Sequence, residues 1–219
     1  MRLQSAIFDM DGTLIDSMFV WKELGTRMLT RQGYNPEPDL YERVKTMTMR
    51  ESATYCKKTY GMPETVQQIE DMIVAEVEDF YANEVQLKPG VQKFLSLLKM
   101  EGVWMYVATN TDKRLAEIAL KHTGIRSYFR GVLTCGEVGL GKAESAEIFE
   151  RCMRRLQSNK RDTVIFEDSL HAIRTARAAG FRICGIYDPS AEEEQEEIKS
   201  LSEYYIRSYE EMFETETLA

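Results

Sequence analysis

The second half of the chain alternates short apolar strands with helices, and this alternation restricts the fold more than any other feature of the sequence. Beyond Lys88-Pro89-Gly90 the predicted strands are Val103–Ala108, Gly131–Thr134, Thr163–Phe166, Arg182–Tyr187 and Tyr204–Ile206. The predicted helices before and between them are Val91–Met100, Asp112–His122, Lys142–Leu156 and Ser169–Ala179. Such an alternation predicts a parallel sheet covered by helices on both faces. The expected fold is an α/β, doubly wound, Rossmann-like core.

A helical segment interrupts this pattern directly after the first predicted strand, Leu3–Phe8. From Met18 to Val85 the apolar residues recur at helical spacing, and one stripe comprises Val66, Ile69, Ile73, Val77 and Phe80. We therefore expect residues 1–16 together with residues 89–219 to form the core. Residues 17–88 are expected to form an inserted helical cap, well placed to close over a site at the end of the first strand.

Composition and charge exclude several classes of partner. The chain has 28 basic and 36 acidic residues, a formal net charge of −8, so it lacks the basic excess that binds nucleic acid or anionic lipid. No apolar run approaches the roughly 18–20 residues that span a bilayer, and the N-terminus does not resemble a signal peptide. Four widely separated cysteines indicate buried thiols in a reducing cytosol rather than a zinc site. We expect a cytoplasmic protein, a monomer or weak homodimer, that binds no membrane.

Polar side chains follow the ends of the predicted strands, where an open parallel sheet binds its ligands. They are Asp9 and Asp11 after the first strand, Thr109 and Asn110 after the second, Lys142 beyond the third, and Glu167 and Asp168 at the fourth. Taken singly, each has an ordinary interpretation as an acidic turn, a helix cap or a surface lysine. Their joint occurrence, in order and each near a strand end, favours a single site.

This set of side chains suits phosphoryl transfer. The carboxylate of Asp9 can attack phosphorus to form an aspartyl-phosphate, and Asp11 can serve as general acid and base. Asp9 and Asp168 are hard oxygen ligands of the kind that Mg²⁺ takes. Hydrogen bonds and positive charge for the transferring phosphate would come from Thr109, Asn110 and Lys142.

Four segments of the chain resemble the motifs of the haloacid dehalogenase-like superfamily. The segment FDMDGTLIDS (8–17) resembles its first motif, and VATN (107–110), GK (141–142) and FEDSLHAIRTARAAG (166–180) resemble the second, third and fourth. The resemblance spans Leu3 to about Asp188 and is greatest to the β-phosphoglucomutase and phosphoglycolate-phosphatase-like branch. It implies a parallel-sheet core with a helical cap inserted before the second motif.

The resemblance also implies a role for each matching residue. Asp9 would be the nucleophile and Asp11 the acid and base, which argues for phosphoryl chemistry, because a true dehalogenase lacks the second aspartate. Mg²⁺ would be held by Asp9, Asp168 and the backbone carbonyl of Asp11, with Glu167 close by or acting through water. Thr109, Asn110 and Lys142 would bind the phosphate. The chain departs from the family after Lys142, where the usual prolines are missing, and at Ala172, where many relatives have glycine.

Substrate choice is expected to depend on the cap. Arg50, at the start of a predicted helix, is the candidate for substrate binding, although it equally suits an exposed helix arginine. The favoured function is a Mg²⁺-dependent phosphatase of a small phosphorylated metabolite, a sugar phosphate or similar. The alternatives are a β-phosphoglucomutase-like sugar phosphomutase and a non-enzymatic phosphoacceptor module.

Two observations weigh against these alternatives. The mutases that the chain resembles have a cap histidine twelve residues after the nucleophile. Here that position is Trp21, and residues 17–88 contain no histidine. Neither Asp11 nor the cap would have a role in a phosphoacceptor module.

Overall fold

The computed structural model describes residues 3–44, 47 and 49–214, which fall into two compact units. One unit comprises the chain up to Asp16 and from Val85 onward, and the other comprises Ser17–Glu84. Residues 85–88, which we assigned to the cap from the sequence, group with the first unit.

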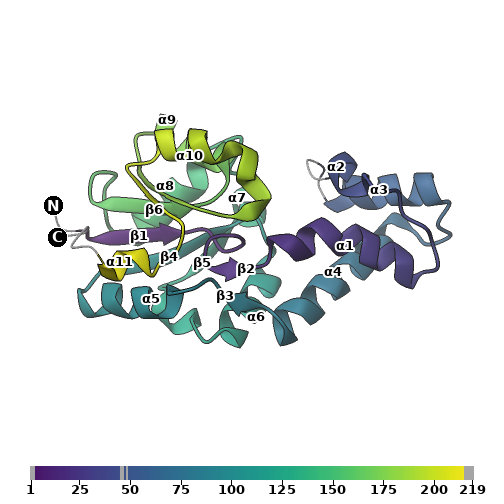
Figure 1. Cartoon of the computed structure of the whole chain (residues 1–219), viewed down its shortest axis with the longest axis horizontal. Coiled ribbons are helices and arrows are strands. Elements are labelled where there is room, and N and C mark those ends of the chain that lie inside the picture. The colour runs from purple at the N-terminus through teal and green to yellow at the C-terminus, as the bar shows by residue number, and fades with distance from the viewer. Residues whose placement is uncertain (1–2, 45–46, 48, 215–219) are drawn as a thin grey trace. The chain divides into compact units, whose positions relative to one another are not determined.

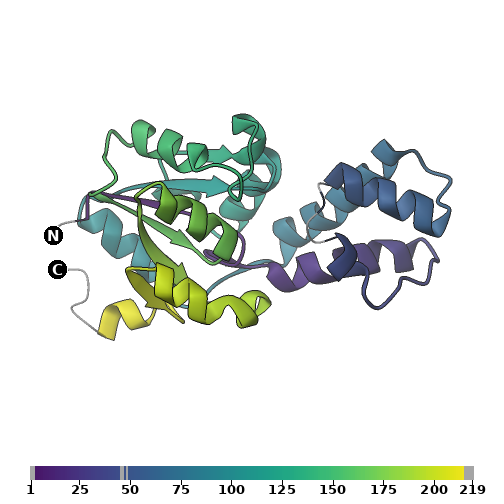
Figure 2. The same cartoon turned by 90° about the horizontal axis from the view of Figure 1, so that it is seen from above.

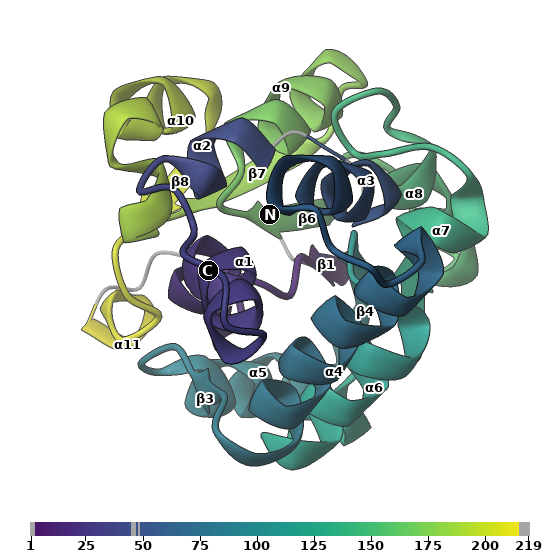
Figure 3. The same ribbon diagram turned by 90° about the vertical axis from the view of Figure 1, so that its right-hand side faces the viewer.

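The first unit is built on a six-stranded sheet in the order β5-β4-β1-β6-β7-β8, and every neighbouring pair is parallel. The strands are β1 (Ser5–Phe8), β4 (Trp104–Thr109), β5 (Val132–Thr134), β6 (Thr163–Glu167), β7 (Arg182–Ile186) and β8 (Tyr204–Ile206). The chain fills one side of β1 with β4 and β5 and then crosses to β6 on the other side, so the strand order switches at β1 (Figure 3). The predicted α/β doubly wound fold is confirmed.

Helices cover both faces of this sheet. They are α5 (Val91–Met100), α6 (Lys113–His122), α7 (Cys135–Val138), α8 (Glu147–Arg155), α9 (Leu170–Ala178), α10 (Gln195–Leu201) and α11 (Glu211–Glu214), with short 3-10 turns η1 (Arg126–Tyr128) and η2 (Pro189–Glu194). Helices α8, α9 and α10 lie on one face, and α5 and α6 lie on the other (Figure 1).

Alternating strand residues supply the two halves of the core, because successive side chains of a strand point to opposite faces. Ile7, Ile165 and Ile183 are buried with residues of α8 and α9. On the opposite face, Phe8 stacks on Phe166 with ring centroids 4.4 Å apart. This packing fixes the ends of β1 and β6, where the acidic residues follow.

The predicted helix over Lys142–Leu156 is wrong at its start, because α8 begins only at Glu147. The carbonyl of Gly141 accepts hydrogen bonds from the amides of Glu144 and Ser145, both at 3.1 Å, and closes a tight turn instead. Lys142 therefore lies in a turn rather than in a helix. The short helix α7, which opens with a capping box of Thr134 and Glu137, was not predicted.

The described part of the second unit contains the helices α1 (Met18–Arg31), α2 (Leu40–Val44), α3 (Met49–Tyr60) and α4 (Val66–Asn83), drawn in purple to blue in Figure 2. Helix α4 opens with a capping box between Thr65 and Gln68. The predicted stripe of α4 is buried except for Val66, which is half-buried. Among the described residues, no helix combines the length and apolar character that a bilayer span requires.

Both linkers to the helical unit belong to a small antiparallel pair of strands. In this pair β2 (Ile15–Asp16) lies against β3 (Gln86–Leu87), with Ile15 opposite Leu87. Two-residue strands are too short to produce a periodic pattern, so the sequence did not predict them. The chain thus leaves and rejoins the first unit at adjacent points.

Candidate active site

Three buried carboxylates gather at the carboxyl ends of β1 and β6. Asp9 directly follows β1, Glu167 is the last residue of β6, and Asp168 comes next. The register that pairs Phe8 with Phe166 brings these residues side by side. One carboxylate oxygen from each lies within 4.8 Å of the other two. A set of clustered carboxylate oxygens is the donor set that suits Mg²⁺.

Lys142 inserts its ammonium group among these carboxylates. Its Nζ donates a hydrogen bond to Asp9 and another, of 2.9 Å, to Glu167. Burial alone would lower the pKa of Lys142, but the charges of Asp9 and Glu167 hold that pKa above its usual value. Lys142 therefore remains charged, although one ammonium does not balance three carboxylates.

Two carboxylates of the cluster have pKa values that are raised chiefly by their burial. Burial raises the pKa of Asp168 to about 8; Glu167 and Asp188 add to this rise, whereas Thr13 and Lys88 oppose it. Burial also raises the pKa of Asp9 well above its usual value, against the effect of Lys142. A bound divalent cation favours the ionised form of such carboxylates, so the residues present fit a metal ion.

Two threonines orient the acidic groups, and the sequence analysis gave a role to neither. Thr13 donates a 2.7 Å hydrogen bond from its hydroxyl to Asp168, and Thr111 donates one of 2.7 Å to Asp11. The Thr111 amide also donates to the Thr109 hydroxyl at 3.0 Å. The only signal in the sequence was the position of both hydroxyls within a few residues of strand ends.

A tight turn after β1 presents Asp11. The amides of Leu14 and Ile15 both donate to the carbonyl of Met10, at 2.9 and 3.0 Å. Gly12 has a φ of +80°, which a residue with a side chain adopts only at a cost. Asp11 is partly exposed at this turn, whereas Asp9 is buried.

The remaining predicted site residues, Thr109, Asn110 and Arg50, are not members of the ion-paired cluster. Thr109 ends β4, the strand beside β1, and is buried, whereas Asn110 is exposed. Arg50 lies in the first turn of α3, in the helical unit, where its side chain is 71% exposed and pairs with Glu70 at 3.4 Å. The role of Arg50 in binding substrate stays a prediction.

Comparison with known proteins decides the family. The sequence profile of the haloacid dehalogenase-like hydrolases matches residues 6–186, which include every strand-end residue described above. The chain belongs to this family.

Two curated relatives of this hydrolase align over most of both chains. A phosphorylated carbohydrates phosphatase of Thermotoga maritima is 26% identical over 185 residues, covering 84% of this chain and 85% of the relative. A fructose-1-phosphate phosphatase of Escherichia coli K12 is 28% identical over 184 residues, covering 82% and 94%. A Thermotoga maritima crystal structure provisionally named β-phosphoglucomutase has a TM-score of 0.80 at 24% identity, covering 96% and 97%, and shares the fold.

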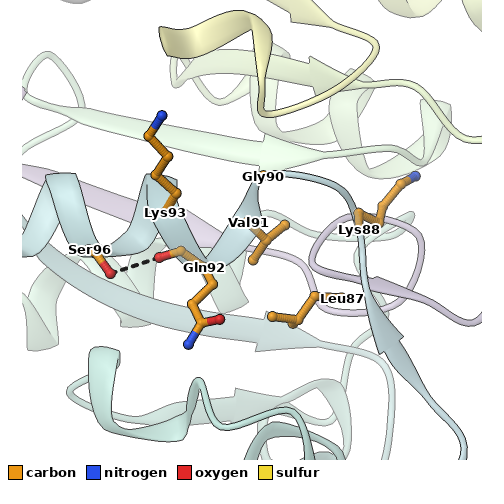
Figure 4. A pocket seen from close by; sticks show the side chains of 7 residues that line it. All are labelled: Leu87, Lys88, Gly90, Val91, Gln92, Lys93 and Ser96. Carbon is orange, nitrogen blue, oxygen red and sulfur yellow. Dashed lines mark hydrogen bonds between the residues drawn. The ribbon is translucent and has the colours of Figure 1, made fainter.

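A pocket of about 540 Å³ lies along the start of α5 (Figure 4). Its lining runs from Leu87 to Ser96 and includes Lys88 and Lys93. No member of the acidic cluster lines this pocket, so we do not assign it to the chemistry of the site.

Proposed function

We propose that this haloacid dehalogenase-like hydrolase is a Mg²⁺-dependent phosphomonoesterase that acts on a small phosphorylated metabolite through an aspartyl-phosphate on Asp9. The observation that carries the proposal is the buried Asp9 carboxylate, ion-paired with Lys142 and clustered with Glu167 and Asp168. The names of the two curated relatives support a phosphorylated carbohydrate as the class of substrate.

Asp9, Asp168 and Glu167 are the side chains that would hold the metal, together with the backbone carbonyl of Asp11. Bound Mg²⁺ would neutralise the carboxylates and hold a phosphate oxygen beside Asp9. Both oxygens of Glu167 already accept hydrogen bonds, one from Lys142 and one from the amide of Ser169 at 3.1 Å. This favours an indirect, water-mediated role for Glu167.

The reaction proceeds in two displacements. In the first, an Asp9 oxygen forms a bond to phosphorus while the ester P–O bond breaks, and the leaving oxygen takes a proton from Asp11. In the second, Asp11 takes a proton from water as that water attacks phosphorus, and the bond to Asp9 breaks. Lys142 balances the charge on the phosphate, to which Thr109 and Asn110 donate hydrogen bonds.

Hydrolysis rather than mutase chemistry is supported by the helical unit. An indole nitrogen can donate a hydrogen bond but cannot accept one, so Trp21 cannot relay a proton. Residues 17–88 contain no histidine that could replace it. The aspartyl-phosphate is therefore expected to react with water.

Phosphate release from a panel of sugar phosphates, nucleotides and phosphoglycolate tests the proposal. Turnover is expected in Mg²⁺, is expected to disappear in EDTA, and should return when Mg²⁺ is restored. Asp9→Asn should be inactive, whereas Asp71→Asn, which removes the same charge from an exposed position, should match the wild type. Full activity in chelator, or an active Asp9→Asn, would overturn the proposal.

A separate assay distinguishes hydrolase from mutase. The protein is incubated with β-glucose 1-phosphate and a trace of the 1,6-bisphosphate. Glucose 6-phosphate formed much faster than free phosphate would show that the mutase alternative is right.

A further inference from the structure

Lys88 is a partly buried lysine outside the carboxylate cluster, and its ammonium group joins three segments of the first unit. Its Nζ donates to the carbonyls of Gly12 and Tyr187, both at 2.6 Å, and to the carboxylate of Asp188 at 2.9 Å. The side chains of Lys88 and Asp188 are only 11% and 2% exposed. An ammonium group has three N–H donors, so every donor of Lys88 is used.

Both partners of this ion pair are fixed by further contacts. The second oxygen of Asp188 accepts from the amide of Ser190 at 2.9 Å, and the carbonyl of Asp188 accepts from the side chain of Gln195. The amide of Lys88 donates to the carbonyl of Leu14 at 3.0 Å. The pair therefore links the end of β7 firmly to the turn that follows β1.

That turn carries the acidic residues of the site. Gly12 lies between Asp11, the proposed acid and base, and Thr13, which holds Asp168. A glycine restricts its own backbone less than any other residue, so contacts from outside add to the hydrogen bonds that close this turn. Figure 4 shows the Lys88 side chain at the end of the pocket, turned away from Gln92 and Ser96.

We infer that Lys88 is a positioning residue that, with Asp188, fixes the Gly12 turn and thereby sets Asp11 and Asp168 for the reaction. The catalytic part of this inference rests on the proposed phosphomonoesterase function. A displacement of about 1 Å in such a group can cost about 100-fold in rate. Neither Lys88 nor Asp188 needs to touch the substrate.

Steady-state kinetics of Lys88→Met provide the first test, because methionine keeps much of the side-chain length without the charge. We expect kcat to fall about 10- to 100-fold while KM changes less than about threefold, since the loss is one of geometry. Arg182→Met is the matched control. Arg182 binds Glu203 and Tyr204 at the opposite end of β7, so its loss also breaks an ion pair of this strand, a more exposed one, but should leave kcat unchanged.

Amide hydrogen exchange provides a readout that does not depend on turnover. In Lys88→Met, peptides covering residues 10–16 and 186–190 should exchange about tenfold faster than in the wild type, whereas Arg182→Met should leave them unchanged. If Lys88→Met does not fold, Asp188→Asn replaces it. Asparagine keeps the shape but loses the charge, and we expect smaller changes in the same direction.

Three outcomes would overturn the inference. The first is an unchanged kcat in Lys88→Met, and the second is a lower kcat in that variant without faster amide exchange in residues 10–16. The third is a loss of kcat in Arg182→Met equal to that in Lys88→Met. A wild type that hydrolyses no ester would instead defeat the proposed function. Exchange would then still decide whether Lys88 holds the turn.

Discussion

Individual residues of the candidate site are held by hydrogen bonds from neighbouring groups. Thr111 illustrates this: it has no place in the motifs read from the sequence, yet its hydroxyl donates to Asp11 at 2.7 Å. A hydrogen bond to a charged group is worth about 1.5–3 kcal/mol. Its loss should therefore be visible in the rate.

Thr111→Val removes this hydroxyl at nearly constant volume. We expect kcat to fall about 10-fold or more, because Asp11 loses its fixed orientation, and KM to change little. Steady-state kinetics on the best ester of the panel measure both. The control is Thr123→Val, whose hydroxyl bonds only within the last turns of α6 and should not affect kinetics. Wild-type kinetics in Thr111→Val would mean that Asp11 is oriented by other contacts.

The sequence predicted which acidic residues would meet but not what orients them. Asp9, Glu167 and Asp168 follow strand ends, and parallel strands bring their carboxyl ends to one edge. The contacts of Thr13 and Thr111 depend on side-chain directions in irregular turns, which no period encodes. The sequence assigned Lys88 only to the end of the predicted cap, since nothing in its neighbours along the chain reveals a partner 100 residues away.

At the level of secondary structure, α5 has a glycine with positive φ at each end. Gly90, its N-cap residue, has a φ of +83°, and Gly102, just beyond its C-cap, has a φ of +77°. A Cβ at Gly90 would lie 2.7 Å from the backbone nitrogen of Glu210, whereas a Cβ at Gly102 would meet nothing within 4 Å. Both positions require a backbone with positive φ, but only at Gly90 would an added side chain collide with neighbouring atoms.

Alanine substitution separates these two effects. Gly102→Ala should cost about 1–2 kcal/mol of unfolding free energy for the left-handed backbone alone. Gly90→Ala should cost about 1–3 kcal/mol more, because the Glu210 backbone must move. Urea unfolding of both variants measures the difference. Equal losses of unfolding free energy in the two variants would show that the backbone at Glu210 moves aside at no energetic cost.

Elements with a clear period were predicted well, and those formed by local hydrogen bonds were not. Strand β8 and helix α5 have the predicted bounds. The start of α8 was predicted too early because the carbonyl of Gly141 accepts hydrogen bonds from two amides ahead of the helix. An apolar stripe does not reveal such a turn, since the stripe marks only the face that packs.

For the whole molecule, the buried carboxylates predict how stability depends on pH when the metal is absent. The pKa of Asp168 rises from an unfolded value of about 3.9 to about 8 in the folded protein. The folded state then binds more protons than the unfolded state, so stability is fully present below the unfolded pKa and is lost as pH rises through the folded value.

In EDTA, the unfolding free energy should fall between about pH 4 and pH 8, and Asp168 alone should contribute at most about 1.4 kcal/mol for each pH step of one between its two pKa values. Asp9, whose pKa is also raised by burial, should add to the fall. Denaturant unfolding across this range measures the fall. Asp168→Asn should make it less steep, whereas Asp71→Asn, with the same change of charge at an exposed position, should not. Parallel curves for the two variants would contradict the assignment.

The pairing of the two linkers, β2 and β3, affects how the inserted segment of such a protein can be replaced during evolution. Ile15 and Leu87 pair with each other, so the two ends of any polypeptide segment inserted between them lie close together, whatever the length of that segment. The entropy of closing a loop grows only slowly with its size, and insertions between neighbouring points disturb few contacts. Recombination could therefore exchange residues 17–84 for another domain whose ends lie close together, and would leave the carboxylate cluster of the first unit intact.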